Sequence, residues 1–177
     1  MVRLKKLEPA KGKKIAIVGC FPETDMLAPF DDPSWEIWGF SRRNMGKLPR
    51  CDKWFELHSP SKFDEYDRVV KGYKAWLQRP NTVLQKDFPK DELVARFGEF
   101  FFDEGQSAWM LAYAISLEPE EIGIWGVECI DKYLRQRYCI HHFYEVARSL
   151  GIKVTVPAGC TLLEPRPLYG FPPALAK

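Results

Sequence analysis

Short apolar runs that alternate with amphipathic segments dominate the pattern of this chain. Residues 14–19 are rich in β-branched side chains and end at a glycine, which is typical of a strand buried on both faces of a parallel sheet. The same pattern predicts five more strands, over residues 35–40, 53–57, 82–85, 121–127 and 153–157.

Apolar residues at three- and four-residue spacings predict helices between these strands. Residues 61–77 are expected to form one amphipathic helix with Ser61 as its N-cap, and residues 91–97 a short helix. Residues 106–117 are apolar nearly all round, which predicts a buried helix. Residues 133–150 predict a long helix, closed by Gly151.

This alternation of strands and helices predicts an α/β fold, a single Rossmann-like domain with a mostly parallel sheet and helices on both faces. We place the domain at residues 1–163. Residues 164–177 hold four prolines and are expected to form a Pro-rich C-terminal tail on the surface.

Composition and charge exclude several classes of protein. The net charge of +2, from 26 Lys and Arg against 24 Asp and Glu, is too balanced to indicate a nucleic-acid binder. No stretch reaches the roughly 20 apolar residues that a membrane span requires. The five scattered cysteines, without a Cys-x-x-Cys pair, favour reduced thiols in a cytoplasmic protein over disulfides or a zinc site.

Candidate ligand-binding residues follow the strands, because the ligand crevice of an open parallel sheet lies beyond the carboxyl ends of its strands. Gln106 and Ser107 open the buried helix, where free backbone N–H groups favour an anion such as phosphate, although Ser107 is also a plausible N-cap. Glu128 and Asp131 are expected to bind ribose hydroxyls or a metal, or else to be exposed loop acids. The candidates that follow strands are Gly19, Phe21, Pro22, Glu23, Thr24, Ser41, Arg42, Arg43, Glu56, His58, Gly126, Glu128 and Asp131.

The two common phosphate-binding motifs are absent. After Gly19 no glycine follows until Gly39, so the Gly-x-Gly-x-x-Gly fingerprint of dinucleotide binding is not present. The Gly-Lys-[Ser/Thr] of a P-loop is missing too. Both absences argue against NAD or FAD bound in the usual way and against phosphate transfer from ATP by a P-loop.

One segment resembles known nucleotide-binding families. Residues 107–128 resemble a helix–strand unit of the bacterial sialyltransferases that use CMP-sialic acid and of the methanopterin pyrophosphokinase-like family. The turn from Gly19 to Pro22 is similar to their Gly-x-Gly-Pro-Ser, with Phe21 in place of the second glycine. The chain as a whole resembles small phage-encoded Rossmann-like proteins of unassigned function.

The motif resemblance covers about a quarter of the chain. It implies that five residues line a nucleotide pocket, namely Gly19, Pro22, Ser107, Gly126 and Glu128. The sequence departs from these families in the middle and after the last motif, so the transferred group is not carried over.

Several of the candidate site residues have two possible interpretations. Gly126 either faces a ligand or lets its strand pass a bulky neighbour. Arg42 and Arg43 either bind phosphate or form a solvated pair. Gln136 and Arg137, near the start of the last helix, face either the crevice or solvent.

The chain has three histidines, and a neutral imidazole is the usual general base. His58 lies at a strand end, and Glu56 lies on the same side of that strand, where it can orient the imidazole. Of the adjacent His141 and His142, only one can point inward, and we take His141 as the second catalytic candidate.

Two function classes remain open. One is a transferase, of glycosyl type, that uses a nucleotide-linked donor. The other is a non-catalytic protein, for example of a phage, that sequesters or senses a nucleotide. The expected ligand is a nucleotide, CMP-like or other, with no further cofactor or metal assigned; the acceptor and the oligomeric state, including a homo-oligomer, stay open.

Overall fold

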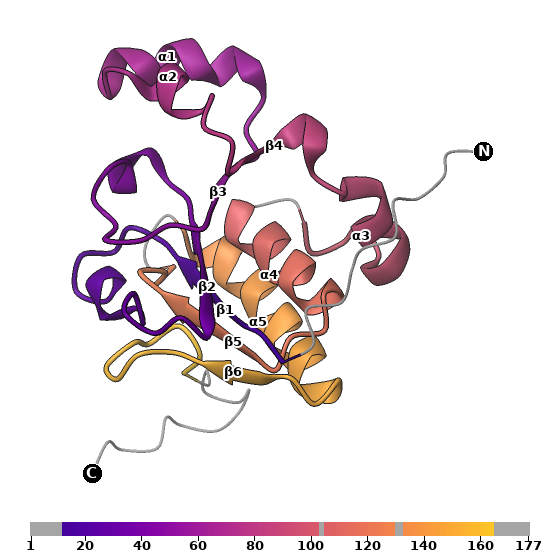
Figure 1. Cartoon of the computed structure of the whole chain (residues 1–177). Helices are drawn as coiled ribbons and strands as arrows, with labels where there is room; N and C mark the ends of the chain where they lie inside the picture. The colour runs from indigo at the N-terminus through magenta and orange to yellow at the C-terminus, as the bar shows by residue number, and fades with distance from the viewer. Residues whose placement is uncertain (1–11, 103–104, 130–132, 165–177) are drawn as a thin grey trace.

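Six parallel strands form one sheet in the structure, a computed structural model that describes residues 12–102, 105–129 and 133–164 (Figure 1). Each predicted strand is confirmed and ends one or two residues earlier than expected. The strands are β1 (Lys14–Val18), β2 (Trp35–Gly39), β3 (Lys53–Glu56), β4 (Thr82–Leu84), β5 (Glu121–Trp125) and β6 (Lys153–Thr155).

The strand order is β4-β3-β2-β1-β5-β6, with every neighbouring pair parallel. The chain adds β2, β3 and β4 outward on one side of β1 and then returns to place β5 on the other side. The order therefore reverses between β1 and β5. In open parallel sheets, the connections that leave the two strands at such a point diverge and open a crevice at their carboxyl ends.

One face of the sheet carries the larger hydrophobic core and the longer helices. Ile15 and Ile17 of β1 and Ile122 and Ile124 of β5 point to this face and are almost fully buried. Figure 1 shows α4 and α5 side by side over it. The helices of this layer are α3 (Lys90–Phe97), α4 (Gln106–Ser116) and α5 (Leu134–Ser149).

The opposite face is covered by shorter elements. Val18 and Ile37 pack there with the segment that contains η1, and Trp54 of β3 packs against Tyr66 and Tyr73. Helices thus lie on both faces, which confirms the predicted α/β class. The elements of this layer and of the connections are η1 (Asp25–Leu27), η2 (Arg42–Asn44), η3 (Pro60–Lys62), α1 (Phe63–Val69), α2 (Tyr73–Trp76) and η4 (Gln85–Asp87).

The prediction of one helix over residues 61–77 is wrong. Ser61 lies inside η3 and caps nothing, and the helical path breaks before Gly72, whose φ is +86°. In an unbroken helix, residues seven positions apart would be separated by about 10 Å along the axis. The break brings the rings of Tyr66 and Tyr73 to 5.8 Å from each other, against the end of β3.

The end of α5 is as predicted. Gly151 has a φ of +75°, and its N–H donates to the Arg148 carbonyl at 3.0 Å. The N–H of Ile152 donates to the Ala147 carbonyl at 3.0 Å, which completes a Schellman motif. The predicted tail falls almost entirely on residues 165–177, outside the described part of the chain. None of the helices in the described ranges has the length and apolar character needed to cross a membrane.

Candidate functional site

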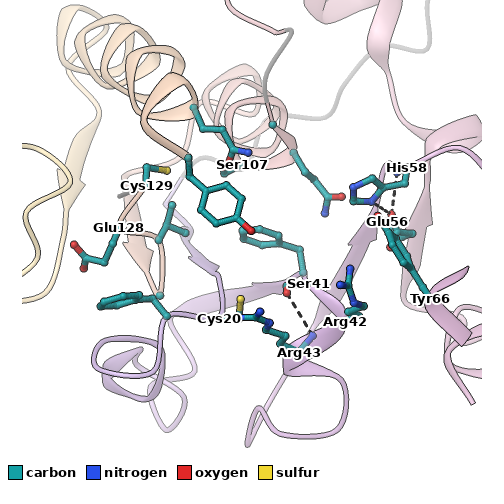
Figure 2. A pocket seen from close by; sticks show the side chains of 18 of the residues that line it. Cys20, Ser41, Arg42, Arg43, Glu56, His58, Tyr66, Ser107, Glu128 and Cys129 are labelled. Carbon is teal, nitrogen blue, oxygen red and sulfur yellow. Dashed lines mark hydrogen bonds and ion pairs between the residues drawn. The ribbon is translucent and has the colours of Figure 1, made fainter. Parts of the chain in front are cut away.

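A cavity of about 740 Å³ lies at the carboxyl edge of the sheet, where the strand order reverses (Figure 2). That volume is within the range of about 300–1,000 Å³ typical of small-molecule sites. The structure brings most of the sequence-predicted site residues to this cavity. Those that line it are Phe21, Pro22, Ser41, Arg42, Arg43, Glu56, His58, Gln106, Ser107, Gly126, Glu128 and Gln136.

Other candidates are not brought there. Asp131 lies outside the described residues, so its place at the site stays a prediction. The remaining candidates are not among the described residues that line the cavity: they are Gly19, Glu23, Thr24, Arg137 and His141. Glu23 is exposed on the turn after β1; the other four have structural partners described below.

Gly19 and Gly126 are needed where the ends of β1 and β5 meet. A Cβ on Gly19 would lie 2.2 Å from the Gly126 carbonyl oxygen, and a Cβ on Gly126 would lie 2.6 Å from the Gly19 carbonyl oxygen. Gly126 also has a φ of +63°. The buried Asn44 side chain donates to the Gly19 carbonyl. Packing of the two strand ends thus explains both glycines, although Gly126 also lines the cavity.

Glu128 is engaged by the protein itself. Its carboxylate accepts the Thr161 N–H at 3.1 Å and the hydroxyls of Thr161 at 3.3 Å and Thr24 at 3.5 Å. The Thr24 hydroxyl in turn accepts the Gly126 N–H at 3.1 Å. Figure 2 shows the Glu128 carboxylate pointing away from the middle of the cavity. This carboxylate holds two turns together, which leaves it little capacity for a ribose. Among the described residues, no group of three or more His, Cys, Asp or Glu side chains is arranged to hold a metal.

Arg137 and His141 fasten the segment that follows β6. The Arg137 guanidinium donates to the carbonyls of Thr161 and Glu164, the latter at 3.4 Å. The His141 Nε2 lies 2.5 Å from the Leu162 carbonyl oxygen. Since that nitrogen donates to a carbonyl, His141 is occupied as a structural residue and does not face the cavity.

Gln106 and Ser107 begin α4 at the wall of the cavity. The Gln106 side chain accepts the Leu57 N–H at 3.0 Å and donates to the Phe55 carbonyl at 2.8 Å, so it ties α4 to the end of β3. The prediction that Ser107 caps the helix is wrong, because Gly105 occupies the N-cap position.

Ser107 instead lies within the first turn. It is 5% exposed, its hydroxyl has no hydrogen-bond partner among the described residues, and it lines the cavity. The first-turn backbone N–H groups of this 11-residue helix also lack helical acceptors. A helix N-terminus with an unpartnered hydroxyl that lines the cavity is suited to bind an anion.

Glu56 and His58 form a hydrogen-bonded pair at the end of β3. The His58 Nδ1 lies 2.5 Å from the Glu56 Oε1, which also accepts the His58 backbone N–H at 2.9 Å. The Tyr73 hydroxyl donates to the other carboxylate oxygen. The Glu56 side chain is 4% exposed, whereas the His58 side chain is 50% exposed and faces the cavity.

These contacts keep Glu56 ionised. Burial alone would raise the pKa of Glu56, but the hydrogen bonds from His58 and Tyr73 outweigh it and hold the pKa below its usual value of 4.5. Burial and the neighbouring carboxylate raise the pKa of Tyr73 far above its usual value, so the phenol keeps its proton. A buried carboxylate that accepts from Nδ1–H selects the imidazole tautomer with a free lone pair on Nε2.

The side of the cavity across from Ser107 is cationic. Arg42 lies with its guanidinium carbon 4.6 Å from the centre of the Tyr66 ring, and the His58 ring meets Tyr66 edge-on at 5.2 Å. Arg43 is the next residue of η2. Figure 2 shows both arginines across the cavity from Ser107, with His58 and Glu56 at one end.

Two residues that line the cavity have a backbone rarely adopted by L-amino acids. Ser41 has a φ of +74° and Cys129 a φ of +51°. Such conformations cost about 1–3 kcal/mol and persist where the surrounding structure requires them, often at functional sites. Burial raises the pKa of the Cys129 thiol to about 12, so this cysteine is protonated at neutral pH and is no nucleophile.

The sequence did not point to Tyr66 and Tyr73 as site residues. Both belong to the apolar spacing that predicts one helix over residues 61–77, since their rings are apolar and recur at helical intervals. A signal was present, however. Glu56 is an acidic residue in a buried strand, and a buried carboxylate requires hydrogen-bond donors, which tyrosine hydroxyls can provide.

Comparisons with known proteins show a likeness in fold. No protein-family profile and no curated protein matches the chain. Among solved structures, the sialyltransferase CstII from Campylobacter jejuni in complex with the substrate analogue CMP-3FNeuAc is 18% identical, with a TM-score of 0.49 over 84% of this chain and 81% of that chain. The sialyltransferase CST-II in complex with a trisaccharide acceptor and CMP is 17% identical, with a TM-score of 0.49 over 84% and 82%. Monomeric CstII is 16% identical, with a TM-score of 0.47 over 81% and 80%. Likeness of this degree carries no residue role or activity to this chain.

Proposed function

We propose that this protein is a group transferase that binds a nucleotide-linked donor in the cavity and uses His58 as its general base. The observation that carries the proposal is the Glu56–His58 pair, in which a buried carboxylate orients a half-exposed imidazole toward the cavity. A protein that only stores a ligand has no need of such a pair.

The chemistry of the proposed step follows from the tautomer. Nε2 of His58 takes the proton of an acceptor hydroxyl, and the acceptor oxygen forms a bond to the transferred carbon of the donor. The bond between that carbon and the phosphate oxygen breaks, and its electron pair leaves with the nucleotide. Glu56 stabilises the imidazolium that results, before its proton passes to solvent. General-base catalysis of this kind contributes roughly 10² to 10⁴ in rate.

Donor binding is assigned to the walls of the cavity. Phosphate oxygens are expected between Arg42, Arg43 and the N-terminus of α4 with the Ser107 hydroxyl. Phe21 offers an aromatic surface for a flat base. The motif resemblance over residues 107–128 is the reason to test cytidine nucleotides first, together with other bases.

The second function class, a non-catalytic nucleotide binder, would favour a pocket closed around its whole ligand. The cavity is instead bordered by exposed side chains, among them Pro22, Arg43 and His58. An open border leaves room for an acceptor. A non-catalytic nucleotide-binding protein is therefore one of the possible outcomes of the test.

Binding and hydrolysis of the donor together test the proposal. Calorimetry against CMP, UMP, AMP, GMP and their sugar conjugates should show micromolar to millimolar binding for at least one. Hydrolysis of the sugar conjugate that binds is then followed for the wild type and for His58→Ala, His141→Ala and His142→Ala.

We expect His58→Ala to lower turnover about 10²- to 10⁴-fold with little change in donor affinity. His142, whose ring stacks on Phe101 at 3.7 Å and does not line the cavity, is the matched control. Equal rates in all four proteins would exclude histidine base catalysis. A wild type that binds a nucleotide tightly and turns nothing over would be a sequestering protein instead.

A further inference from the structure

A second cavity, of about 400 Å³, lies directly beside the first. The two cavities share three residues, His58, Gly105 and Gln106, so these form the border between them. The residues that line the second cavity are Leu57, His58, Gln85, Phe88, Lys90, Phe102, Gly105, Gln106 and Trp109. The proposed base therefore faces two separate volumes.

Three aromatic side chains line the second cavity, namely Phe88, Phe102 and Trp109. Trp109 stacks on Phe102 with 3.9 Å between ring centres and meets Phe88 edge-on at 6.0 Å. Phe102 and Phe88 are buried, whereas Trp109 is half-buried, so the indole is the exposed part of this stack. Gln85 and Lys90 add exposed hydrogen-bonding groups to the rim.

Hydrogen bonds hold two of the three border residues, Gln106 and His58. The Gln106 side chain makes two hydrogen bonds to the end of β3, and the His58 imidazole is held by Glu56. Molecules in the two cavities would thus have the imidazole between them. Fixed relative placement of two reactants is the main requirement for transfer between them.

We propose that the second cavity is the acceptor site and takes a hydroxyl-bearing ring compound with an apolar face, of which a hexose is the simplest form. The proposal rests on the proposed function. The apolar face of the ring lies on Trp109, its hydroxyls reach Gln85 and Lys90, and one hydroxyl reaches His58 Nε2 and gives up its proton there. The oxygen left behind is then directed at the donor carbon in the first cavity.

Chemistry distinguishes the two cavities. Two arginines and the N-terminus of α4 border the first, as an anionic donor requires. The second is lined by the aromatic stack and, at about 400 Å³, is near the lower end of small-molecule sites. An aromatic stack beside a comparable share of polar surface favours a ring that carries hydroxyls at its edge and C–H groups on its face.

Direct binding tests the acceptor site without any turnover. Ligand-observed NMR is recorded with methyl glucoside, methyl galactoside and methyl mannoside at millimolar concentration, with glycerol as a polyol that has no ring. Each is repeated with a saturating amount of the nucleotide that calorimetry selects. We expect at least one glycoside to bind, glycerol not to bind, and the nucleotide not to displace the glycoside.

Variants place the glycoside in the second cavity. Trp109→Ala should weaken glycoside binding about tenfold or more, and Trp109→Phe should restore part of it, because an aromatic face remains. Trp76→Ala removes another half-buried tryptophan, one that does not line either cavity, and serves as the control.

Three results would overturn the acceptor site: no glycoside binds, the nucleotide displaces the glycoside, or the Trp109 variants bind it as the wild type does. If no nucleotide binds, displacement cannot be measured. The effect of the Trp109 variants on glycoside binding then decides by itself whether the second cavity is the acceptor site. Failure of the proposed function has a different signature, because it removes donor hydrolysis while glycoside binding is still measured.

Discussion

The contact between the ends of β1 and β5 makes a quantitative prediction about Gly126. In Gly126→Ala the new Cβ would lie 2.6 Å from the carbonyl oxygen of Gly19, 2.7 Å from its carbonyl carbon and 2.8 Å from the Cβ of Asp25. Two of these atoms are backbone, so the strand ends themselves must move apart. The sequence-based view of Gly126 as a ligand-facing strand end would instead predict loss of binding with an intact fold.

Two costs add up at this position. The φ of +63° is unfavourable for alanine by about 1–2 kcal/mol. Overpacking a well-packed site costs about 1–3 kcal/mol more. We therefore expect Gly126→Ala to lower the free energy of unfolding by about 2–5 kcal/mol, which for a chain of this size corresponds to a fall in Tm of about 4–20 °C.

Gly151→Ala is the matched control. Gly151 has a similar φ of +75°, but nothing lies within 4 Å of the position a Cβ would take. It should therefore show the conformational cost of about 1–2 kcal/mol alone. Urea unfolding followed by tryptophan fluorescence measures both variants. If Gly126→Ala is no more destabilised than Gly151→Ala, the close approach of the two strand ends is not what requires this glycine.

Two further predictions concern the border of the cavity. Gln106→Ala leaves the Leu57 N–H and the Phe55 carbonyl without their partner, so it should lower the free energy of unfolding by about 1–3 kcal/mol. Gln78→Ala, at an exposed position, is the control and should change it little. Equal effects of the two variants in urea unfolding would count against the contribution of these two hydrogen bonds to stability. Glu56→Gln tests the lowered pKa of Glu56. The ionised carboxylate contributes stability that is complete above its usual pKa of 4.5 and is lost as the pH falls through the lower pKa of the folded state. The difference in unfolding free energy between wild type and variant should therefore disappear in acid. A gap that stays constant from neutral pH to about pH 3 would contradict that pKa direction.

The positions of the strands and of the crevice could be predicted from the sequence because both depend on local patterns. The β-branched run that forms β1 and the glycine after it mark a buried strand without reference to any partner. The rule that parallel strands present their carboxyl ends at one edge then gathers distant residues at one place. That reasoning placed Ser41, Arg42 and His58 among the candidates, and all three line the cavity.

Roles that depend on contacts between distant segments could not be predicted. The Thr24 hydroxyl and Glu128 are 104 residues apart in sequence, and Arg137 and Thr161 are 24 apart. No local pattern shows that a polar side chain already has a buried partner. The sequence therefore indicated ligand binding for the Glu128 carboxylate and the Arg137 guanidinium, which instead join turns of the protein itself.

By itself, the sequence determined the α/β class, the strand positions and the edge at which a site would form, since hydrophobic periodicity and turn residues are read over a few positions. Only the tertiary structure decided how the polar groups are partnered. The break before Gly72 brings Tyr73 to Glu56, and Glu56 orients His58, whereas His141 is held by the segment after β6. Buried polar groups must be satisfied, and which partner satisfies each depends on how the whole chain packs.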